Sequence, residues 1–318
     1  MNGSNWYLLQ QLLNWLEQGI DPWLATVLET YGSSPRPVGS MMLYHPTKGI
    51  VGSLSGGCIE QELVEQLPHA EPLSPKAINR PQVIRYGGST EEQQRLQLPC
   101  GGHLDVLLEK ITADKADHFS QLFQALKLRH HTGREINLLS GELAIIDDQS
   151  LKNDIQRDDQ VVRQALRPHD KLLMVGAGEV ARCVAEIAKN LEFEITLCDF
   201  RDEFLQGWHV EGVTVVKGMP DDLIAESFND PHCAIVALAH DPRIDDMAML
   251  EALNSEAFYV GAMGSLKTSA KRRERLLELG ITQRALAQLH APIGLDIGSK
   301  TPYEIALSIV THIIQQRP

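Results

Sequence analysis

The sequence predicts an α/β protein in which a mixed α+β domain comes first and a doubly wound parallel sheet follows. Two observations carry this prediction. A short apolar run, residues 172–175, leads into a glycine turn, a helical pattern and a second apolar run that ends at Asp199. Apolar runs and helical patterns then alternate to the C-terminus, whereas residues before about 112 show short strand patterns separated by loops rich in glycine, serine and proline. The two parts of the chain therefore belong to different structural classes.

The glycine turn has the form of a dinucleotide-binding unit, which makes the second domain Rossmann-like. Gly176 permits the turn, and Gly178 lets a phosphate approach the backbone where the helix begins. Ala181 is small enough for close packing of helix on strand. Asp199, 21 positions after Gly178, is expected to accept hydrogen bonds from a ribose and to repel a 2′-phosphate. The alternative is that the turn is rich in glycine only for steric reasons and binds no ligand. Asp199 is then a solvated carboxylate at a strand end.

Length and charge exclude several classes of function. With 318 residues, 43% of them hydrophobic, the chain is long enough for two globular domains. Its net charge of −13 argues against a broad surface for nucleic acid or for an anionic membrane. The sequence shows neither an apolar run of roughly 18 residues nor a secretion signal. Five cysteines without a CxxC pair indicate a reducing compartment, so we expect a cytoplasmic protein.

The first part of the chain is expected to form helices and short strands. Apolar residues recur at helical spacing from Ser4 to Gln18, and Gly19 ends the pattern. Ser89 and Glu92 have the spacing of a capping box and predict a short helix. The expected strands are residues 23–31, 41–44, 50–54, 83–86 and 104–111.

Three loops in this part are candidates for a binding site. Residues 32–39 form a rigid polar loop suited to gripping an oxyanion, or simply a surface connection. A Ser/Gly/Gly turn places Cys58 in the first turn of a helix, where a thiolate or a bound anion is favoured. The alternative for Cys58 is a small packed side chain, and Glu60 and Glu62 suit the first helical turn without any further role. A second cysteine turn lies at residues 98–102. The candidate ligand-binding residues are Ser33, Arg36, Ser55, Gly56, Gly57, Cys58, Cys100, Gly101 and Gly102.

The middle of the chain is expected to connect the two domains. A helix is predicted at residues 114–128, and residues 135–139 and 143–146 look like a hairpin. The strongly polar stretch 147–169 is expected to contain the linker, with the boundary near 165. The predicted organisation is an N-terminal domain at 1–112, a connecting region and linker at 113–168, and the Rossmann-like domain at 169–318.

In a doubly wound sheet, ligands bind at the carboxyl ends of the strands. Loops 176–178, 199–201, 239–243 and 261–265 each end a predicted strand. His240 and Asp241 form either a general base or ligand-binding pair, or a strand-end histidine satisfied by its neighbour. The candidate ligand-binding residues here are Gly176, Gly178, Asp199, Arg201, His240, Asp241, Gly264 and Ser265.

Two further sets of residues invite interpretation. The predicted helix after Ser265 carries a basic cluster that binds either a phosphate or an acidic partner, or is only a solvated face. Its members are Lys267, Lys271, Arg272, Arg273 and Arg275. Three cysteines, Cys183, Cys198 and Cys233, are expected to be buried as small hydrophobic residues. No histidine and cysteine spacing resembles a zinc site.

Motifs in both domains together resemble the XdhC/CoxI family, the xanthine dehydrogenase accessory factors. The N-terminal motifs are Gly32-Ser-Ser-Pro-Arg-Pro, Gly52-Ser-Leu-Ser-Gly-Gly-Cys-Ile-Glu60 and Leu98-Pro-Cys-Gly-Gly102. The C-terminal motifs are Gly176-Ala-Gly178, Asp199-Phe-Arg201, His240-Asp-Pro-Arg243, Tyr259-Val-Gly-Ala-Met-Gly-Ser265, Leu289-His-Ala-Pro-Ile-Gly-Leu-Asp-Ile-Gly298 and Thr301-Pro-Tyr-Glu-Ile-Ala306. The resemblance spans nearly the whole chain except residues 112–168.

The resemblance implies a cytoplasmic maturation factor for molybdenum hydroxylases such as xanthine dehydrogenase. It implies a cofactor-binding chaperone, with no catalytic residue assigned, that binds molybdenum cofactor as cargo, supports its sulfuration by a cysteine desulfurase and delivers it to the apo-enzyme. It also implies a homodimer. The glycine and cysteine turns around Cys58 and Cys100 are then expected near the cofactor, and the Rossmann-like loops are expected to hold its phosphate or a nucleotide.

Two other functions remain compatible with the residues. One is an NAD(H)-dependent oxidoreductase that uses the glycine turn and Asp199, with His240 as an acid or base. The other is a protein-binding factor that uses the basic helix after Ser265.

Overall fold

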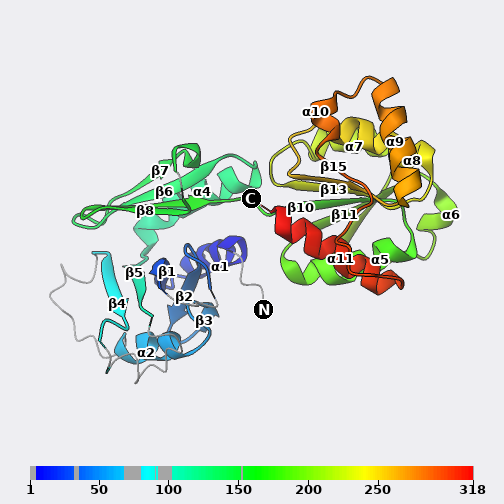
Figure 1. The fold of residues 1–318 in the computed structure, drawn as a ribbon. Helices are drawn as coiled ribbons and strands as arrows, with labels where there is room; N and C mark the ends of the chain where they lie inside the picture. Colours follow the sequence, from blue (N-terminus) through cyan, green and yellow to red (C-terminus); the bar gives the residue numbers. More distant parts are fainter. Residues whose placement is uncertain are drawn as a thin grey trace. The chain divides into compact units, whose positions relative to one another are not determined.

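The computed structural model describes residues 5–31, 36–67, 80–89, 91, 102–151 and 153–317, apart from the side chains of Cys58 and Ser150. The chain divides into two compact units, Met1–Pro168 and His169–Pro318, which we call the first and the second unit (Figure 1). In the part of the chain that the structure describes, we find no helix that is both long and apolar enough to cross a membrane.

The first unit contains a five-stranded antiparallel sheet in the order β3-β2-β1-β5-β4. Helix α1 and helix α4 pack together on one face of this sheet, where Leu12 and Phe119 are buried. Helix α2 covers the other face with Ile59 and Leu63. The bounds are α1 Asn5–Glu17, β1 Trp23–Thr30, β2 Met41–His45, β3 Gly49–Gly52, α2 Cys58–Gln66, β4 Gln82–Tyr86, β5 Leu104–Lys110 and α4 Ala116–Lys127. The helices predicted at 4–18 and 114–128 and the five predicted strands are confirmed, and the capping-box prediction at 89–92 falls largely outside the described residues.

A second antiparallel sheet in the first unit, ordered β7-β6-β9-β8, was only half predicted. Its strands are β6 Thr132–Asn137, β7 Leu143–Ile146, β8 Ile155–Arg157 and β9 Val161–Leu166. The expected hairpin β6–β7 is present, but the stretch expected to hold the linker instead forms β8 and β9. These strands lack a clear apolar pattern because some of their buried side chains are polar. Gln164 is fully buried and accepts a hydrogen bond from Arg134, 2.9 Å away. Arg134 in turn forms a buried ion pair with Glu109 of β5, at 2.9 Å.

The second unit is built on a six-stranded parallel sheet in the order β12-β11-β10-β13-β14-β15. The strands are β10 Lys171–Val175, β11 Glu194–Asp199, β12 Val213–Lys217, β13 Cys233–Ala237, β14 Tyr259–Ala262 and β15 Leu289–His290. The chain starts in the centre at β10, moves outward through β11 and β12, and then crosses to β13 on the other side. This reversal confirms the predicted doubly wound, Rossmann-like sheet.

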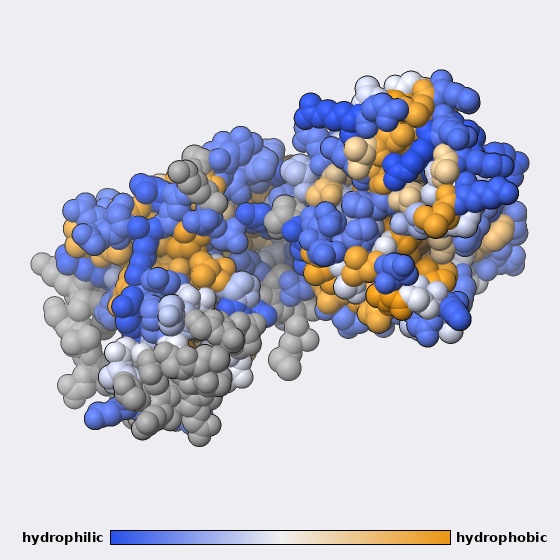
Figure 2. Space-filling model, viewed as in Figure 1, coloured by the Kyte–Doolittle hydropathy of each residue, from blue (hydrophilic) through white to orange (hydrophobic). Residues whose placement is uncertain are grey.

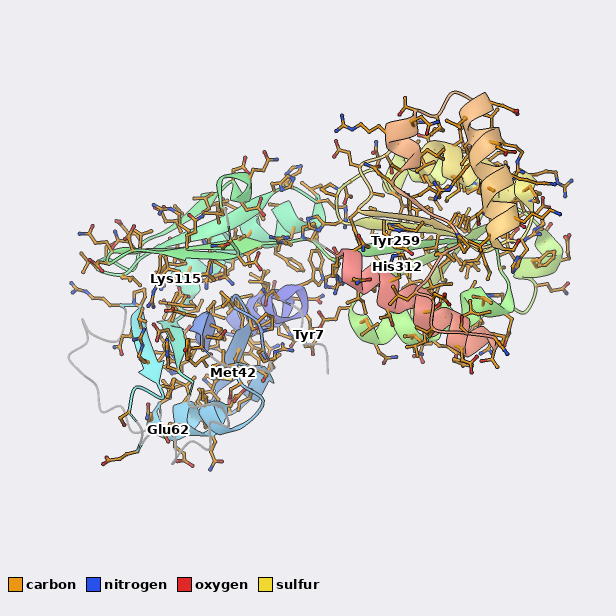
Figure 3. The ribbon with its side chains drawn as sticks, in the orientation of Figure 1. Tyr7, Met42, Glu62, Lys115, Tyr259 and His312 are labelled. Atoms are coloured by element: carbon orange, nitrogen blue, oxygen red, sulfur yellow. The ribbon has the colours of Figure 1, made fainter. Side chains whose placement is uncertain are left out.

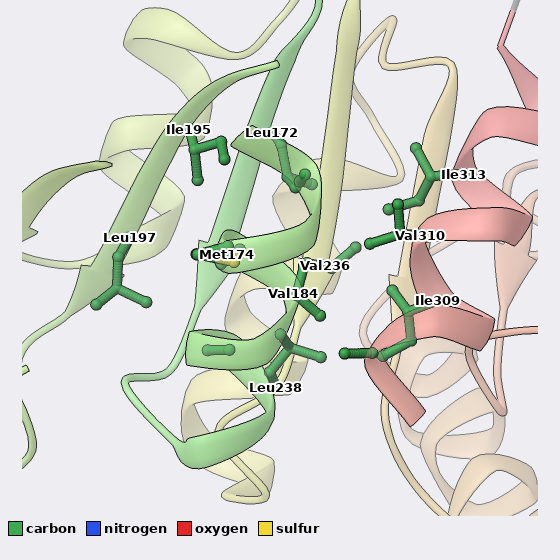
Figure 4. Packing of buried hydrophobic residues seen from close by; sticks show 14 of the residues in the cluster. Leu172, Met174, Val184, Ile195, Leu197, Val236, Leu238, Ile309, Val310 and Ile313 are labelled. Carbon is green, nitrogen blue, oxygen red and sulfur yellow. The ribbon is translucent and has the colours of Figure 1, made fainter. Parts of the chain in front are cut away.

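Helices cover both faces of the parallel sheet (Figure 1). On one face, α5 and α11 close a core in which Val184 and Ile309 meet Val236 of β13 and Leu238 directly after it (Figure 4). On the other face, α7, α8 and α9 contribute Ile224, Met249 and Leu276 to a second core. The bounds are α5 Glu179–Ala188, α6 Asp202–Leu205, α7 Pro220–Ser227, α8 Pro242–Ala252, α9 Leu266–Glu278, α10 Gln283–Leu286 and α11 Pro302–Gln316.

A small aromatic cluster joins α11 to the sheet. The ring of Tyr259 stacks on His290, with centroids 4.6 Å apart, and its hydroxyl lies 3.0 Å from Nδ1 of His312 (Figure 3). Burial lowers the pKa of both histidines, so the neutral rings are favoured. Outside this contact α11 still exposes Tyr303, Leu307 and Ile314. Figure 2 shows a mainly hydrophilic face with separate hydrophobic patches on each of the two units.

Candidate functional site

The carboxyl ends of the parallel strands bring together the four loops predicted for a ligand site. Because β11, β10, β13 and β14 are consecutive neighbours in the sheet, the loops that follow them emerge side by side at one edge. These loops lie at residues 176–178, 199–201, 239–243 and 261–265. The structure therefore gathers the predicted segments, although their residues have different roles.

Gly176 serves the fold. Its φ angle is +104°, and a Cβ at this position would lie 2.4 Å from Cα of Ala239 on the neighbouring chain segment. Gly178 is different, because a Cβ there would meet only the carbonyl oxygen of Leu238, at 3.9 Å. Gly178 is the N-cap of α5, and no side chain caps this helix start. The first helical turn therefore keeps backbone N–H groups that can meet an anion.

Asp199 does not offer the free carboxylate that a ribose would need. It is fully buried and accepts hydrogen bonds from the backbone N–H of Ala177, at 2.9 Å, and from Arg201. Arg201 donates from its backbone nitrogen at 3.0 Å, from Nε at 2.9 Å and from Nη2 at 2.7 Å. Burial acts to raise the pKa of Asp199, but these hydrogen bonds outweigh it and lower the pKa. In this arrangement Asp199 fixes the glycine turn, and its charge is already neutralised by Arg201.

A pocket of about 790 Å³ opens at the carboxyl edge of the sheet in the second unit. The predicted residues His240, Gly264 and Ser265 line it, whereas Gly176, Gly178, Asp199, Arg201 and Asp241 are not among its lining residues. Its apolar lining includes Val180, Met263, Ile293, Leu295 and Ile305, and its polar lining includes Asp245, Thr268, Arg272, Asp296, Ser299 and Ser308. The volume falls within the range of roughly 300–1,000 Å³ that is usual for small-molecule sites.

Two of the lining residues, Asp245 and Arg272, form a buried ion pair that sequence reasoning missed as a pair. Asp245 is fully buried, and its carboxylate accepts from Ala239 N at 3.2 Å and from Nη2 of Arg272 at 3.0 Å. Burial raises the pKa of Asp245 to about 6, although the charge of Arg272 opposes this shift. Arg272 also donates to Asp246, at 2.9 Å, and to the carbonyl oxygen of Met263, at 3.0 Å. The pair thus ties α8, α9 and the end of β14 together beneath the pocket.

The basic helix is not a free cationic surface. Arg272 is buried, Arg273 donates to the carbonyl oxygens of Leu286 and Leu289, and Arg275 pairs with Asp246. Only the two lysines of the predicted cluster, Lys267 and Lys271, are exposed on α9. The hypothesis of an anion- or partner-binding basic helix is therefore wrong for its three arginines, because all three hold the second unit together.

His240 and Asp241 do not act as a pair. His240 is exposed at the pocket and has a φ angle of +56°, a left-handed conformation that is uncommon outside glycine. Asp241 is the N-cap of α8, where it accepts from the backbone of Arg243 at 3.0 Å and pairs with its guanidinium at 2.7 Å. The hydrogen bonds from Arg243 lower the pKa of Asp241 to about 2. The strand-end turn thus presents the imidazole of His240 to the pocket without a carboxylate partner from Asp241.

The three cysteines of the second unit are buried, as predicted. Burial raises the pKa of the Cys198 thiol to about 11 and raises that of Cys183 as well. These thiols are packing residues of the sheet and of α5.

In the first unit, the strand ends that flank the three candidate loops lie at the same edge of the sheet. Strand β1 ends and β5 begins there, and Tyr31 N donates to the carbonyl oxygen of His103 at 2.9 Å. Strand β3 ends at the same edge, before the turn at residues 53–57. Arg36 is half-buried ahead of β2, and Gly102 is buried ahead of β5. Ser33, Cys100, Gly101 and the side chain of Cys58 lie outside the described residues.

The Ser/Gly/Gly turn already holds an anion of its own. The carboxylate of Glu60 accepts hydrogen bonds from the backbone N–H groups of Ser55, Gly56 and Gly57, at 2.8, 3.0 and 2.9 Å. The expectation that this turn is open to an external anion is therefore wrong for the described structure. So is the interpretation of Glu60 as only a favourable charge in the first helical turn.

The sheet order, the glycine turn and the pocket at the carboxyl edge define a Rossmann-type ligand-binding protein with an additional α+β unit. Two family models match the chain: the XdhC Rossmann domain over residues 172–313, and the XdhC and CoxI family over residues 15–71. The chain belongs to the XdhC/CoxI family.

Similar proteins are found in several bacteria. A protein of Bacillus subtilis (strain 168), named as a probable subunit of xanthine dehydrogenase, is 26% identical, over 98% of this chain and 96% of its own length. The molybdenum cofactor insertion chaperone PaoD of Escherichia coli (strain K12) is 24% identical, over 92% of this chain and 83% of its own. A crystal structure from Bacillus halodurans, described as a xanthine dehydrogenase, superposes with a TM-score of 0.78 at 25% identity and covers 98% of this chain and 95% of its own.

Proposed function

We propose that this protein binds molybdenum cofactor as cargo and inserts it into a molybdenum hydroxylase of the xanthine dehydrogenase type. The observation that carries the proposal is the pocket at the carboxyl edge of the second unit, which lies within the part of the chain that matches the XdhC Rossmann domain. The names of the similar proteins from B. subtilis and E. coli point to the same cargo and client.

The chemistry of the pocket fits a phosphorylated pterin. Val180, Ile293 and Ile305 offer apolar contacts for a fused ring and exclude water from it. The exposed carboxylate of Asp296 is suited to the amino and ring N–H donors of a pterin, whereas that of Asp245 is already bound by Arg272 and by the backbone of Ala239. The N-terminus of α9, at Ser265 and Leu266, adds backbone N–H groups that favour a phosphate. The pocket thus combines apolar walls with polar groups that can orient a small cofactor.

The proposal has further parts that rest on membership of the family. Sulfuration of the cofactor by a cysteine desulfurase, a homodimeric state and a cytoplasmic location all belong to it. So do contacts from Ser33, Arg36, Cys58 and Cys100 of the first unit to the cofactor. Replacing either cysteine with alanine is expected to weaken retention of the cofactor if its thiol contacts the cargo.

No observation favours the NAD(H)-dependent oxidoreductase. Asp199, the residue expected to recognise the ribose of NAD, is buried and bound by Arg201 and by the glycine turn. We retain the proposal that the first turn of α5 binds the phosphate of the cargo or of a nucleotide.

The proposal predicts that the purified protein carries a pterin. The full-length chain is produced in cells that make molybdenum cofactor, purified without denaturation, and its bound small molecules are identified by mass spectrometry. We expect a molybdopterin species in an amount approaching one per chain, and its transfer to apo-xanthine dehydrogenase should restore enzyme activity. If the protein carries no pterin under conditions in which a known carrier retains it, the proposal fails.

A further inference from the structure

The turn between β3 and α2 is wrapped around one carboxylate, that of Glu60. Oε1 accepts four hydrogen bonds and Oε2 accepts two. The donors to Oε1 are Ser53 Oγ at 2.7 Å, Leu54 N at 2.8 Å, Ser55 N at 2.8 Å and Gly56 N at 3.0 Å, and the donors to Oε2 are Ser55 Oγ at 2.5 Å and Gly57 N at 2.9 Å. Four consecutive backbone N–H groups that converge on one anion form a nest of the kind that binds phosphates in other proteins.

This arrangement exceeds what helix capping requires. A glutamate at the third position of a helix reaches back to the N-cap N–H, and the contact with Gly57 supplies that bond. The donors of the five other hydrogen bonds precede the N-cap, so these bonds do not cap the helix. Gly56 adopts a φ angle of +92°, so the turn relies on a residue without a Cβ to direct its N–H groups inward.

The charge of Glu60 is held firmly in this nest. The residue is 6% exposed, and burial alone would raise the pKa of its carboxyl. Hydrogen bonds from Ser53, Ser55 and the surrounding backbone outweigh burial and hold the pKa far below its ordinary value. Glu62, labelled on α2 in Figure 3, differs because it accepts from Gln66 one turn further along the helix, at 2.6 Å.

We propose that Glu60 is the built-in anion of an oxyanion-binding nest and acts as a positioning residue that fixes the backbone from Ser53 to the start of α2 at Cys58. A small carboxylate or another oxyanion enters this nest only when the carboxylate of Glu60 is absent. Phosphate groups of any cargo are bound elsewhere. This inference does not depend on the identity of the cargo.

Chemical rescue of Glu60→Ala tests the proposal. Removing the carboxylate leaves three N–H groups and two hydroxyls without their acceptor and the N–H of Gly56 with only Ser53 Oγ at 3.2 Å, so we expect the melting temperature to fall by roughly 5–15 °C. Hydrogen exchange of the peptide that covers residues 53–60 should accelerate at least ~10-fold. Excess sodium formate should restore much of the stability and of the protection, because formate supplies the same two oxygens, whereas sodium chloride at equal ionic strength should not.

Glu65→Ala is the matched control. Glu65 is exposed on the same helix, so its replacement makes the same change in charge without opening the nest, and formate should have no effect on this variant. If Glu60→Ala does not fold, Glu60→Gln takes its place. In Glu60→Gln the side-chain amide group would face the N–H donors of the nest. Residues 53–60 of this variant should therefore also lose protection from hydrogen exchange. The proposal is overturned if the Glu60 variants match Glu65→Ala in stability and exchange, or if folded Glu60→Ala shows no response to formate.

Discussion

Replacing Arg272 with methionine is expected to destabilise the second unit by about 3–5 kcal/mol at neutral pH. Methionine retains much of the volume but leaves Asp245 without its cation and Asp246 with only Arg275. Arg272 is almost completely buried, so water cannot replace the lost hydrogen bonds. The carbonyl oxygen of Met263 at the pocket wall loses its donor as well. We therefore expect this variant to lose its cargo together with its stability.

The cost should depend on pH in a defined direction. Burial raises the pKa of Asp245 in the folded state to about 6, above its ordinary value of 3.8, and Arg272 limits that rise. Without Arg272 the pKa of Asp245 rises further. A carboxyl whose pKa is raised by folding makes the folded protein less stable as the pH increases from the unfolded-state pKa toward the folded-state pKa. The difference in unfolding free energy between variant and wild type should therefore be smaller at about pH 5 than at about pH 7.5.

Urea denaturation of the full-length chain at the two pH values measures this effect. Lys271→Met is the matched control, because Lys271 is exposed on the same helix and its replacement removes the same positive charge. We expect this control to change stability by no more than about 0.5 kcal/mol. An Arg272→Met variant as stable as the control would show that the buried ion pair does not hold α8 and α9 together.

Gly176→Ala is expected to destabilise the second unit by roughly 2–4 kcal/mol. The added Cβ would lie 2.4 Å from Cα and 2.5 Å from the backbone nitrogen of Ala239, at a φ angle of +104° that alanine rarely adopts. Neither problem can be relieved by a side-chain rotation, so the strand ends of β10 and β13 must move apart.

Gly178→Ala is the comparison that separates packing from binding. The φ angle of Gly178 is −96°, and its added Cβ has no close neighbour, so stability should change by less than about 1 kcal/mol. Thermal denaturation of both variants gives the answer. Equal destabilisation of the two would contradict the assignment of Gly176 to packing, whereas loss of cargo in stable Gly178→Ala would indicate that a ligand approaches the start of α5.

Much of the fold was predictable because its signals are local. The apolar runs of β10 and β13 and the capping signals at Ser265 and Thr301 mark strands and helix starts without help from distant residues. Strands β8 and β9 were missed because their burial depends on partners such as Arg134, more than 25 residues away in the sequence. The two-residue strand β15 is too short to carry a periodic pattern.

The site was predictable in its location and less so in its chemistry. The order of the strands places loops at the carboxyl edge, and three of the predicted residues line the pocket there. The roles of Asp199, Glu60 and Arg272 could not be foreseen, because each is decided by a partner that the fold supplies. For Asp199 and Arg272, a charge that suggested a ligand in the sequence is satisfied within the protein itself. Glu60, expected only to suit the first helical turn, is instead the acceptor for the whole turn before α2. The pocket ion pair Asp245–Arg272 had one signal in the sequence: Arg272 lies at helical spacing between Ser269 and Leu276, the other two buried residues of α9.

Retention of molybdenum cofactor by a pocket-blocked variant tests the central claim most directly. Ser299 is half-buried in the pocket lining, so Ser299→Trp fills the space with an indole, while Ser227→Trp adds the same side chain to an exposed position at the end of α7. Both proteins are loaded with the cofactor and separated from free ligand, and the retained pterin is measured by fluorescence after oxidation. We predict that Ser227→Trp retains as much pterin as the wild type and that Ser299→Trp, with an unchanged melting temperature, loses at least about tenfold in affinity. Equal retention by the two variants would contradict the proposal that the pocket of the second unit holds the cargo.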